Sequence, residues 1–264
     1  MTAIHLFGMS PARSGDLLVT IPSSQAYPLI RKLESITDLT QAETEALLAL
    51  PMRVQDIRAD QDIVREGDRP SQCCLLLEGF MARFKHTEKG KRQIFAFHTP
   101  GDIPDVLSLQ LKTMDHSLGT ISPCKVGFIQ HEHMRALLRR HPRLMEVFWR
   151  ETLIDGAIFR EWMVGIGRRD AKTRIAHLLC EMVMRLRAVG LEQDNTVPLP
   201  ITQAEVGDAL GLSTVHVNRT LQVLRGENLV EWDKGVLTVL DWEGLKHAGE
   251  FDPDYLHQDR KDVA

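Results

Sequence analysis

The clearest hydrophobic pattern lies in the last third of the chain. Apolar residues from Ile175 to Leu186 recur at intervals of three and four, which predicts an amphipathic helix. Asp170 can cap the N-terminus of this helix, and Gly190 can close its C-terminus. After a polar loop at residues 191–200 the same period returns in two shorter stretches. We therefore expect three consecutive helices, each with one buried face.

The two shorter stretches meet at Gly211, where the chain must turn and a residue without a Cβ is favoured. Thr202 and Glu205 have the spacing of a capping box, and Ser213 can cap the second helix. The apolar residues fall on one side of both predicted helices: Val206, Leu210, Leu212, Val217, Leu221 and Leu224. This pattern is that of a helix-turn-helix.

The outward face of the second predicted helix carries residue types that read DNA: Val215, Asn218, Arg219 and Gln222. Such side chains suit contacts with base edges in a major groove, and Arg219 is expected to discriminate between bases. The start of the first helix is expected to touch mainly phosphate. The complete set of expected DNA contacts is Thr202, Gln203, Ser213, Thr214, Val215, His216, Asn218, Arg219 and Gln222.

A hairpin signal follows the helix-turn-helix. Residues 229–239 read as a strand, a turn at residues 233–235 and a second strand. A helix-turn-helix followed by a hairpin is a winged helix, and it predicts sequence-specific binding of double-stranded DNA. The competing interpretation is a buried corner of two helices. The protein would then be a ligand-sensing or protein-interaction module that does not bind DNA specifically.

The middle of the chain, from Val54 to Gln130, has a sequence pattern typical of β-strands. Short β-prone runs alternate with turn residues at Asp62–Arg65, Cys73–Leu77, Phe80–Phe84, Arg92–Phe97 and Cys124–Ile129. Their spacing predicts an antiparallel β-roll or jelly roll. The preceding stretch from Tyr27 to Leu50 is predicted to be helical, and residues 1–27 read as a tail.

A long helix is expected between the roll and the winged helix. Residues 131–140 predict one helix, and Pro142 can start another that runs to about Ile166. Its apolar residues form a seam near a three/four spacing: Met145, Phe148, Thr152, Phe159, Met163 and Ile166. Such a seam predicts a homodimer interface, with packing on the chain's own sheet as the alternative. Gly165 and Gly167 are expected to end the helix and to act as a hinge.

Together these elements predict an α+β protein. The expected segments are an N-terminal tail (1–27), the roll (28–140), the dimerisation helix and hinge (141–167), the winged helix-turn-helix (168–245) and a C-terminal tail (246–264). A short last helix, at residues 242–248, is expected after Asp241.

Composition adds constraints to this outline. No apolar run approaches the roughly 18 residues of a membrane span, and the N-terminus lacks the features of a signal peptide, so a cytoplasmic protein without membrane contact is expected. The net charge of −4 does not favour DNA binding, and residues 200–240 hold three basic against five acidic side chains. Binding would therefore depend on where the charges lie.

The four cysteines form no Cys-x-x-Cys pair, and no metal site is expected. The adjacent Cys73 and Cys74 are expected to be buried in a strand, with a redox switch as the alternative. The motifs of common enzyme sites are also missing. Gly165-Ile-Gly167 lacks the third glycine of a dinucleotide fingerprint, and neither His-Glu-x-x-His nor Gly-x-Ser-x-Gly occurs, so no enzyme is expected.

The order of roll, long helix and winged helix resembles the Crp/Fnr family of bacterial transcription regulators over residues 28–245. Ile63-Val-Arg-Glu-Gly-Asp68, followed by Glu78-Gly79, is similar to the family's first cyclic-nucleotide signature. Arg219 matches the family arginine that reads a guanine, whereas Val215 replaces a base-reading glutamate. The resemblance implies a homodimer on a pseudo-palindromic operator, with RNA polymerase as a further partner.

The second signature of that family bears on the ligand. Members of that family that bind cyclic nucleotides have Gly-Glu followed by small residues, and then an arginine that pairs with the cyclic phosphate. This chain has Gly101-Asp102-Ile-Pro, no arginine between Arg92 and Arg135, and Asp115 near the expected arginine position. We therefore expect no regulation by cyclic nucleotides.

No cofactor is expected. The spacing of His98 and His116 does not support haem, which the family's carbon-monoxide sensor binds, and residues 1–72 lack the cysteine cluster of its oxygen sensor. An unidentified effector in a remodelled roll stays open. Its expected pocket is Phe97, His98, Gly101, Asp102, His116, Ser117 and Phe159.

Overall fold

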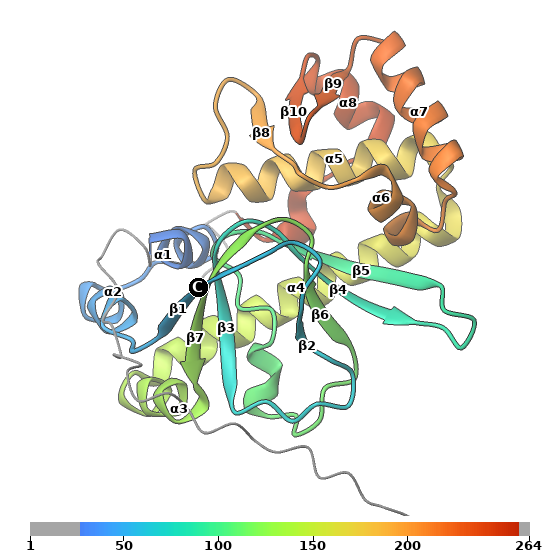
Figure 1. Ribbon diagram of the computed structural model, residues 1–264. Coiled ribbons are helices and arrows are strands. Elements are labelled where there is room, and N and C mark those ends of the chain that lie inside the picture. Colours follow the sequence, from blue (N-terminus) through green and yellow to red (C-terminus); the bar gives the residue numbers. More distant parts are fainter. Residues whose placement is uncertain (1–26, 259–264) are drawn as a thin grey trace, which may run out of the picture.

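The computed structural model describes residues 27–258, so residues 1–26 of the expected N-terminal tail and the last six residues lie outside the described part. Figure 1 shows the β-roll below and the winged domain above it, with α4 (Pro142–Arg168) and α5 (Ala171–Ala188) meeting at one end like the arms of a V. The expected α+β architecture is confirmed.

Two antiparallel sheets form the roll, in the strand orders β1-β7-β3 and β2-β6-β4-β5. The strands are β1 (Arg53–Ile57), β2 (Asp62–Val64), β3 (Gln72–Glu78), β4 (Met81–His86), β5 (Arg92–His98), β6 (Ser117–Thr120) and β7 (Cys124–Gln130). A short 3-10 helix, η1 (Val106–Leu109), follows β5, and α3 (His131–Arg140) follows β7. The inward side chains of both sheets are buried, because a roll closes its sheets over one core.

The expected single helix from Tyr27 to Leu50 is wrong. The chain forms α1 (Tyr27–Glu34) and α2 (Gln41–Leu48) instead. Thr40 and Glu43 build a capping box, in which the Thr40 amide donates to Glu43 Oε2 at 2.8 Å. In the capping box the Thr40 and Glu43 amides pair with side chains, whereas in a continuous helix they would pair with backbone carbonyls of the preceding turn. A new helix therefore begins here.

Helix α4 ends at Arg168, one residue beyond the expected end at Gly165–Gly167. The bend falls at Arg169 and Asp170, where the Asp170 side chain accepts a hydrogen bond from the Thr173 amide and starts α5.

The winged domain continues from α5 through β8 (Thr196–Pro198), α6 (Gln203–Leu210), α7 (Thr214–Gly226), β9 (Val230–Asp233), β10 (Val236–Val239) and α8 (Trp242–Gly249). Strands β9 and β10 form the expected hairpin, with Lys234 and Gly235 at positive φ in its turn. Helix α8 confirms the expected last helix at residues 242–248, whereas the expected C-terminal tail is wrong for residues 249–256. These residues complete α8 and form η2 (Pro253–Leu256), whose Leu256 is buried.

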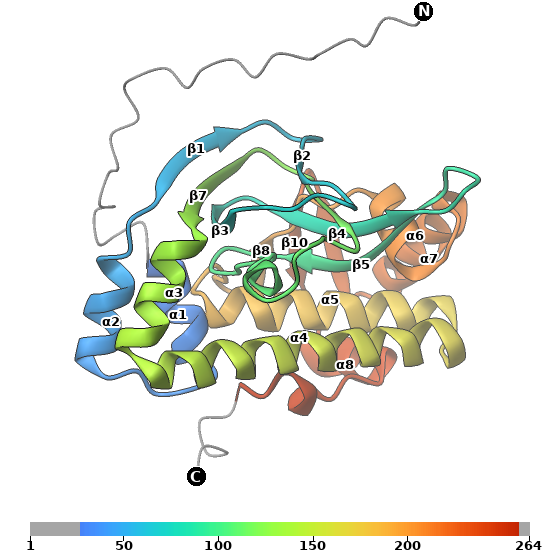
Figure 2. The ribbon, with the colours of Figure 1, turned by 90° about the horizontal axis from the view of Figure 1, so that it is seen from below.

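The roll and the winged domain share one hydrophobic core. Phe97 of β5, Trp162 of α4 and Leu178 of α5 are buried in the same cluster. Figure 2 shows α4 and α5 side by side below the roll, with α8 next to them. Polar contacts add to this packing, since Arg92 of β5 pairs with Asp208 of α6 at 2.8 Å. The winged domain is thus packed directly against the roll.

Buried charges cross the same junction. Asp102, in the turn after β5, pairs with Lys32 of α1 at 2.6 Å and with Arg185 of α5 at 3.1 Å. Arg83 of β4 donates to the Pro104 carbonyl and pairs with Asp155 of α4. Burial opposes the charge on Asp102, but Lys32 and Arg185 outweigh it and hold the pKa of this carboxyl well below its usual range. We call Lys32, Arg83, His98, Asp102, Glu151, Asp155 and Arg185 the junction cluster.

His98 is the uncharged member of the junction cluster. Its Nδ1 lies 3.2 Å from Asp102 Oδ2, a contact that favours the imidazolium. Burial and the nearby Arg83 guanidinium oppose it more strongly and lower the pKa of His98 to about 4. The folded protein therefore keeps this ring neutral at neutral pH.

The pH dependence of stability follows from that shift. The pKa of His98 is about 4 when folded, against 6.5 in its ordinary state. As the pH falls below 6.5, His98 becomes protonated in the unfolded chain but stays neutral in the folded chain until about pH 4. The unfolding free energy therefore decreases over this range. Between pH 7 and pH 5, wild-type protein should lose about 2 kcal/mol more unfolding free energy than His98→Gln.

Urea unfolding at the two pH values measures this difference. The buried Asp105, whose raised pKa acts in the opposite direction, is present in both proteins and so does not affect the comparison. His257→Gln, which removes an exposed histidine, is the control. Parallel pH profiles for wild type and His98→Gln would contradict the assignment of a neutral buried ring.

Candidate nucleic-acid interface

Helices α6 and α7 form the expected helix-turn-helix. The Thr202 amide donates to Glu205 Oε2 at 2.7 Å, and the Glu205 amide donates to Thr202 Oγ1 at 3.2 Å, which completes the capping box. Gly211 is left-handed, at φ 67°, and Ser213 Oγ accepts from the His216 amide at 3.2 Å. Each cap lies where the sequence predicts it.

Close packing of the two helices needs a glycine that the sequence analysis did not identify. A Cβ on Gly207 would lie 2.6 Å from the Leu212 carbonyl oxygen, which is backbone and cannot move aside cheaply. A small residue one turn before Gly211 was the available sequence signal. Gly207 therefore fixes how closely α7 crosses α6.

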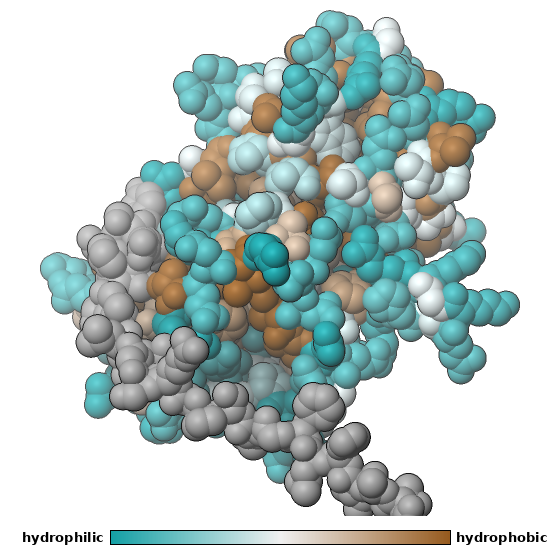
Figure 3. All heavy atoms as spheres, viewed as in Figure 1, coloured by the Kyte–Doolittle hydropathy of each residue, from teal (hydrophilic) through white to brown (hydrophobic). Residues whose placement is uncertain are grey.

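The outward face of α7 is available to a ligand. Val215 is 80% exposed, which is unusual for an apolar side chain on a short helix. Asn218, Arg219 and Gln222 are also exposed on this face. Among the described residues, Arg219 has no hydrogen bond or ion pair. Figure 3 shows a mostly hydrophilic surface over α7 with isolated apolar areas. A free guanidinium beside an exposed methyl-bearing side chain suits base edges.

The remaining expected DNA contacts surround that face. Thr202 and Thr214 are exposed at the starts of α6 and α7, while His216 is half-buried. Gln203 accepts from Asn218 Nδ2 at 3.2 Å, which links the two helices. Ser213 is exposed, but its hydroxyl oxygen is engaged as the cap of α7. The structure thus gathers all nine expected contacts at one end of the winged domain.

Basic residues upstream contribute less to this surface than the sequence suggested. Arg169 pairs with Glu161 at 2.6 Å, Lys172 pairs with Glu227 at 2.6 Å, and Arg174 donates to the Leu210 carbonyl. These charges hold the domain together, whereas Arg168 is exposed at the end of α4. The positive field near α7 is therefore local.

The second candidate surface is an apolar stripe along α4. Met145, Thr152, Phe159, Met163 and Ile166 are exposed, as expected for a seam. Phe148 is a correction, because it is only 4% exposed and packs in the core of the roll.

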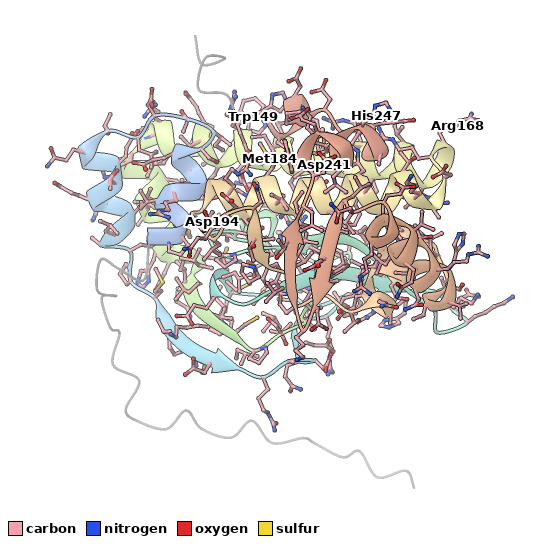
Figure 4. The ribbon with its side chains drawn as sticks, turned by 90° about the horizontal axis from the view of Figure 1, so that it is seen from above. Trp149, Arg168, Met184, Asp194, Asp241 and His247 are labelled. Atoms are coloured by element: carbon pink, nitrogen blue, oxygen red, sulfur yellow. The ribbon has the colours of Figure 1, made fainter. Side chains whose placement is uncertain are left out.

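Trp149, which the sequence analysis missed, takes the place of Phe148 and is 65% exposed. It extends a seven-residue repeat with Gly156 and Met163, and the strict repeat was the signal that could have identified it. Figure 4 labels Trp149 and Arg168, which lie toward opposite ends of α4.

A groove of about 550 Å³ adjoins the stripe near the start of α4. It is mostly apolar and lies between η1, α3 and α4. Its lining residues are Val106, Leu107, Leu109, Gln110, Arg135, Leu138, Arg139, Met145, Phe148, Trp149 and Thr152. The four from α4 have the i, i+3, i+4, i+7 spacing of a hole that receives a side chain from a facing helix.

The expected effector pocket is wrong, because its residues do not line one cavity. Phe97 is buried in the shared core, and His98 and Asp102 belong to the junction cluster. A Cβ on Gly101 would lie 2.5 Å from the Pro28 carbonyl oxygen, so this turn packs closely on α1.

The other three residues of the expected pocket, two on the roll and one on α4, have different surroundings. His116 and Phe159 each contact Phe95 edge-on, and Ser117 lines a polar depression on an outer face. Between the Asp102 turn and α4 the junction cluster leaves about 30 Å³, room for one water molecule.

All four cysteines are buried, and burial raises the pKa of their thiols. Cys73 and Cys74 are fully buried on opposite faces of β3, and burial raises the pKa of Cys73 to about 12. Residues 27–258 contain no group of three or more metal-ligating side chains arranged to hold an ion. None of the described helices is both long and apolar enough to span a membrane.

Comparisons with known proteins agree with this architecture. Residues 54–141 match the cyclic nucleotide-binding domain, and residues 173–248 match the Crp-like helix-turn-helix domain. The transcriptional activator protein FnrA of Stutzerimonas stutzeri is 26% identical, over 78% of this chain and 84% of the relative. The nitrogen fixation regulation protein FixK of Bradyrhizobium diazoefficiens is 29% identical, over 80% and 88%.

Among solved structures, FixK2 from Bradyrhizobium japonicum superposes with a TM-score of 0.69 at 22% identity. The match covers 75% of this chain and 98% of FixK2, and it shows the same fold. The two matched domains, in this order around a long helix, place the chain among bacterial regulators. The protein belongs to the Crp/Fnr family and is a DNA-binding transcription regulator.

Proposed function

We propose that this protein is a homodimer that reads an inverted-repeat operator with α7 and needs no cyclic nucleotide to do so. The observation that carries the proposal is the exposed face of α7, where Arg219 is free and Val215 protrudes. A cytoplasmic location and contact with RNA polymerase form part of the proposal, since such a regulator acts on transcription.

Recognition would divide between the two helices. Arg219 suits a bidentate contact with guanine, and Val215 suits the methyl group of thymine. Thr202 and Gln203, at the N-terminus of α6, suit phosphate oxygens because helix amides there favour negative charge. Because Val215 replaces a glutamate, the preferred half-site should differ from that of the best-known relatives.

Dimerisation would occur along α4. Regulators of this family act as dimers, and the exposed apolar stripe of α4 has the seven-residue repeat of a parallel coiled coil. Trp149 of one copy would fill the groove beside α4 of the other. The two α7 helices of the dimer would then contact DNA half-sites that lie about one helical turn, roughly 34 Å, apart.

The junction cluster supports independence from cyclic nucleotides. Asp102 already binds Lys32 and Arg185, and the adjacent space of about 30 Å³ is far smaller than a nucleotide. The arginines nearby are engaged as well, since Arg83 pairs with Asp155. A phosphate would have to displace these buried pairs, which is costly.

Selection from random DNA tests the function directly. Wild-type protein should enrich an inverted repeat, and its affinity should fall steeply with salt because several phosphates are neutralised together. Arg219→Ala should weaken binding by about 1–3 kcal/mol and relax the preference at one guanine in each half-site. Arg58→Ala, on the exposed end of the roll, is the matched control.

The opposite result would favour the rival function. A flat salt response with no enriched motif would indicate a ligand-sensing or protein-interaction module that keeps the helix-turn-helix shape. Specific binding that survives in Arg219→Ala would show that the assignment of α7 to the groove is wrong.

Sedimentation tests the interface. Trp149→Ala should raise the dimer dissociation constant at least 30-fold, because a buried tryptophan anchor is worth about 2 kcal/mol or more. Leu240→Ala removes an exposed apolar residue of the winged domain, outside the stripe and the groove, and should leave the constant unchanged. A wild-type monomer at micromolar concentration, also with operator DNA, would contradict the proposal.

Titration calorimetry tests the ligand. Millimolar cyclic AMP or cyclic GMP should give no saturable heat, since the junction cluster occupies the turn that would bind the phosphate. The operator affinity should be the same with and without the nucleotides. Saturation at micromolar concentration would refute the argument from the buried pairs.

A further inference from the structure

The chain beyond α8 folds back over the bend between α4 and α5. The helix-turn-helix match ends at residue 248, so the segment at residues 249–256 lies outside it. Figure 2 shows this segment beneath α4 and α5, on the side away from the roll. We call residues 249–256 the C-terminal clasp.

Apolar packing anchors the clasp. Phe251 and Leu256 are buried in the same core as Trp162 of α4. The clasp also touches backbone directly, because a Cβ on Gly249 would lie 2.7 Å from the His177 amide nitrogen of α5. The Tyr255 ring stacks on His177, with ring centroids 5.7 Å apart. The clasp therefore contacts both arms of the bend.

A buried carboxylate joins the clasp to both helices. Glu181 of α5 is fully buried, and its Oε2 accepts from Trp162 Nε1 of α4 at 2.9 Å and from the Tyr255 hydroxyl at 3.0 Å. Its Oε1 accepts from Arg185 at 3.2 Å. One side chain thus holds three elements in one geometry, because each acceptor is directional.

The same network continues into the roll. Arg185 donates to the Phe97 carbonyl at 2.7 Å and to Asp102 at 3.1 Å. A second link spans the bend itself, where Arg169 pairs with Glu161 of α4 and Glu250 of the clasp. A continuous chain of contacts therefore runs from Tyr255 to the Asp102 turn.

We propose that the C-terminal clasp sets the orientation of the winged domain on α4, with Glu181 and Tyr255 as positioning residues. The inference rests on the proposed dimer. In that dimer the angle between α4 and α5 decides how far apart the two α7 helices stand, and only two residues, Arg169 and Asp170, separate these helices. The clasp would preset the operator spacing without an effector.

Binding to DNA of varied spacing tests the clasp. The variants are a chain that ends at Ala248 and Tyr255→Phe, which removes one hydroxyl and keeps the ring. A chain that ends at Gln258 keeps the clasp and is the matched control. Each protein is titrated with the selected inverted repeat, with repeats whose spacer is two base pairs longer or shorter, and with a single half-site.

The clasp variants should bind the selected repeat about tenfold more weakly. Once one winged domain is bound, the less constrained winged domain of the other copy has a lower effective concentration at its half-site. Their affinity for a single half-site should change by less than about twofold, since α7 itself is untouched. They should also discriminate less between spacers. Tyr255→Phe carries this test even if the shortened chain fails to fold.

A distance measurement in the free dimer gives a second readout. A nitroxide on Gln222→Cys reports the separation of the two α7 helices, and the four native cysteines are buried. The distance distribution should be narrow in wild type and in the chain ending at Gln258, and broad in the clasp variants.

Three outcomes would overturn the inference. Equal losses on the half-site and the repeat would mean that the clasp only supports the domain's fold. An unchanged spacer preference with an unchanged distance distribution would mean that other contacts set the angle. A wild-type chain without preference for the repeat over the half-site would refute the proposed dimeric function, and the clasp inference with it.

Discussion

The arrangement of the two domains depends on the hydrogen bonds that the buried Arg185 side chain makes across their junction. Its helix belongs to the winged domain, yet its guanidinium lies inside the junction with the roll, where it bonds to Asp102 and to the Phe97 carbonyl. A buried guanidinium loses its hydration, and this loss is offset only where acceptors surround the charge. Glu181 and Asp102 supply these acceptors from two sides. Because hydrogen bonds to a planar guanidinium are directional, the junction has one preferred geometry as well as an apolar core.

This arrangement changes the part that the roll can play. A roll that senses a ligand needs an open space beside the Asp102 turn and an unpaired cation for an anionic group. In this chain, side chains from α1, α4 and α5 converge there, and opposite charges pair with one another. Under the proposed function, these internal ion pairs link the roll to the winged domain without a ligand.

The two candidate surfaces satisfy opposite demands. On α7, Arg219 has no hydrogen bond or ion pair to another described residue, so its guanidinium keeps its hydrogen-bonding capacity for a base edge. On α4, apolar side chains remain exposed to water, which is unfavourable. Packing of another surface against them would remove this contact with water. Most basic residues near the bend pair internally, as Arg169 does with Glu161. Affinity would then come from a few well-placed contacts on each half-site, doubled by the dimer.

Features that depend on a few neighbouring residues were determined by the sequence itself. The caps at Thr202, Asp170 and Ser213 and the turn at Gly211 need only a side chain and an amide within about four residues. The same locality made the outward face of α7 predictable, because a helix displays every third or fourth residue on one side.

Tertiary structure decided the rest. Phe148 and Trp149 are adjacent apolar residues on α4, and only the position of the roll determines which of them is buried. The members of the junction cluster are scattered from Lys32 to Arg185, and no local pattern brings such distant charges together. The C-terminal clasp has the polar composition of a tail, but Phe251 and Leu256 find an apolar surface that exists only after α4 and α5 have packed. Contacts of this kind depend on which surfaces meet in the folded chain, and periodicity along the sequence does not encode that choice.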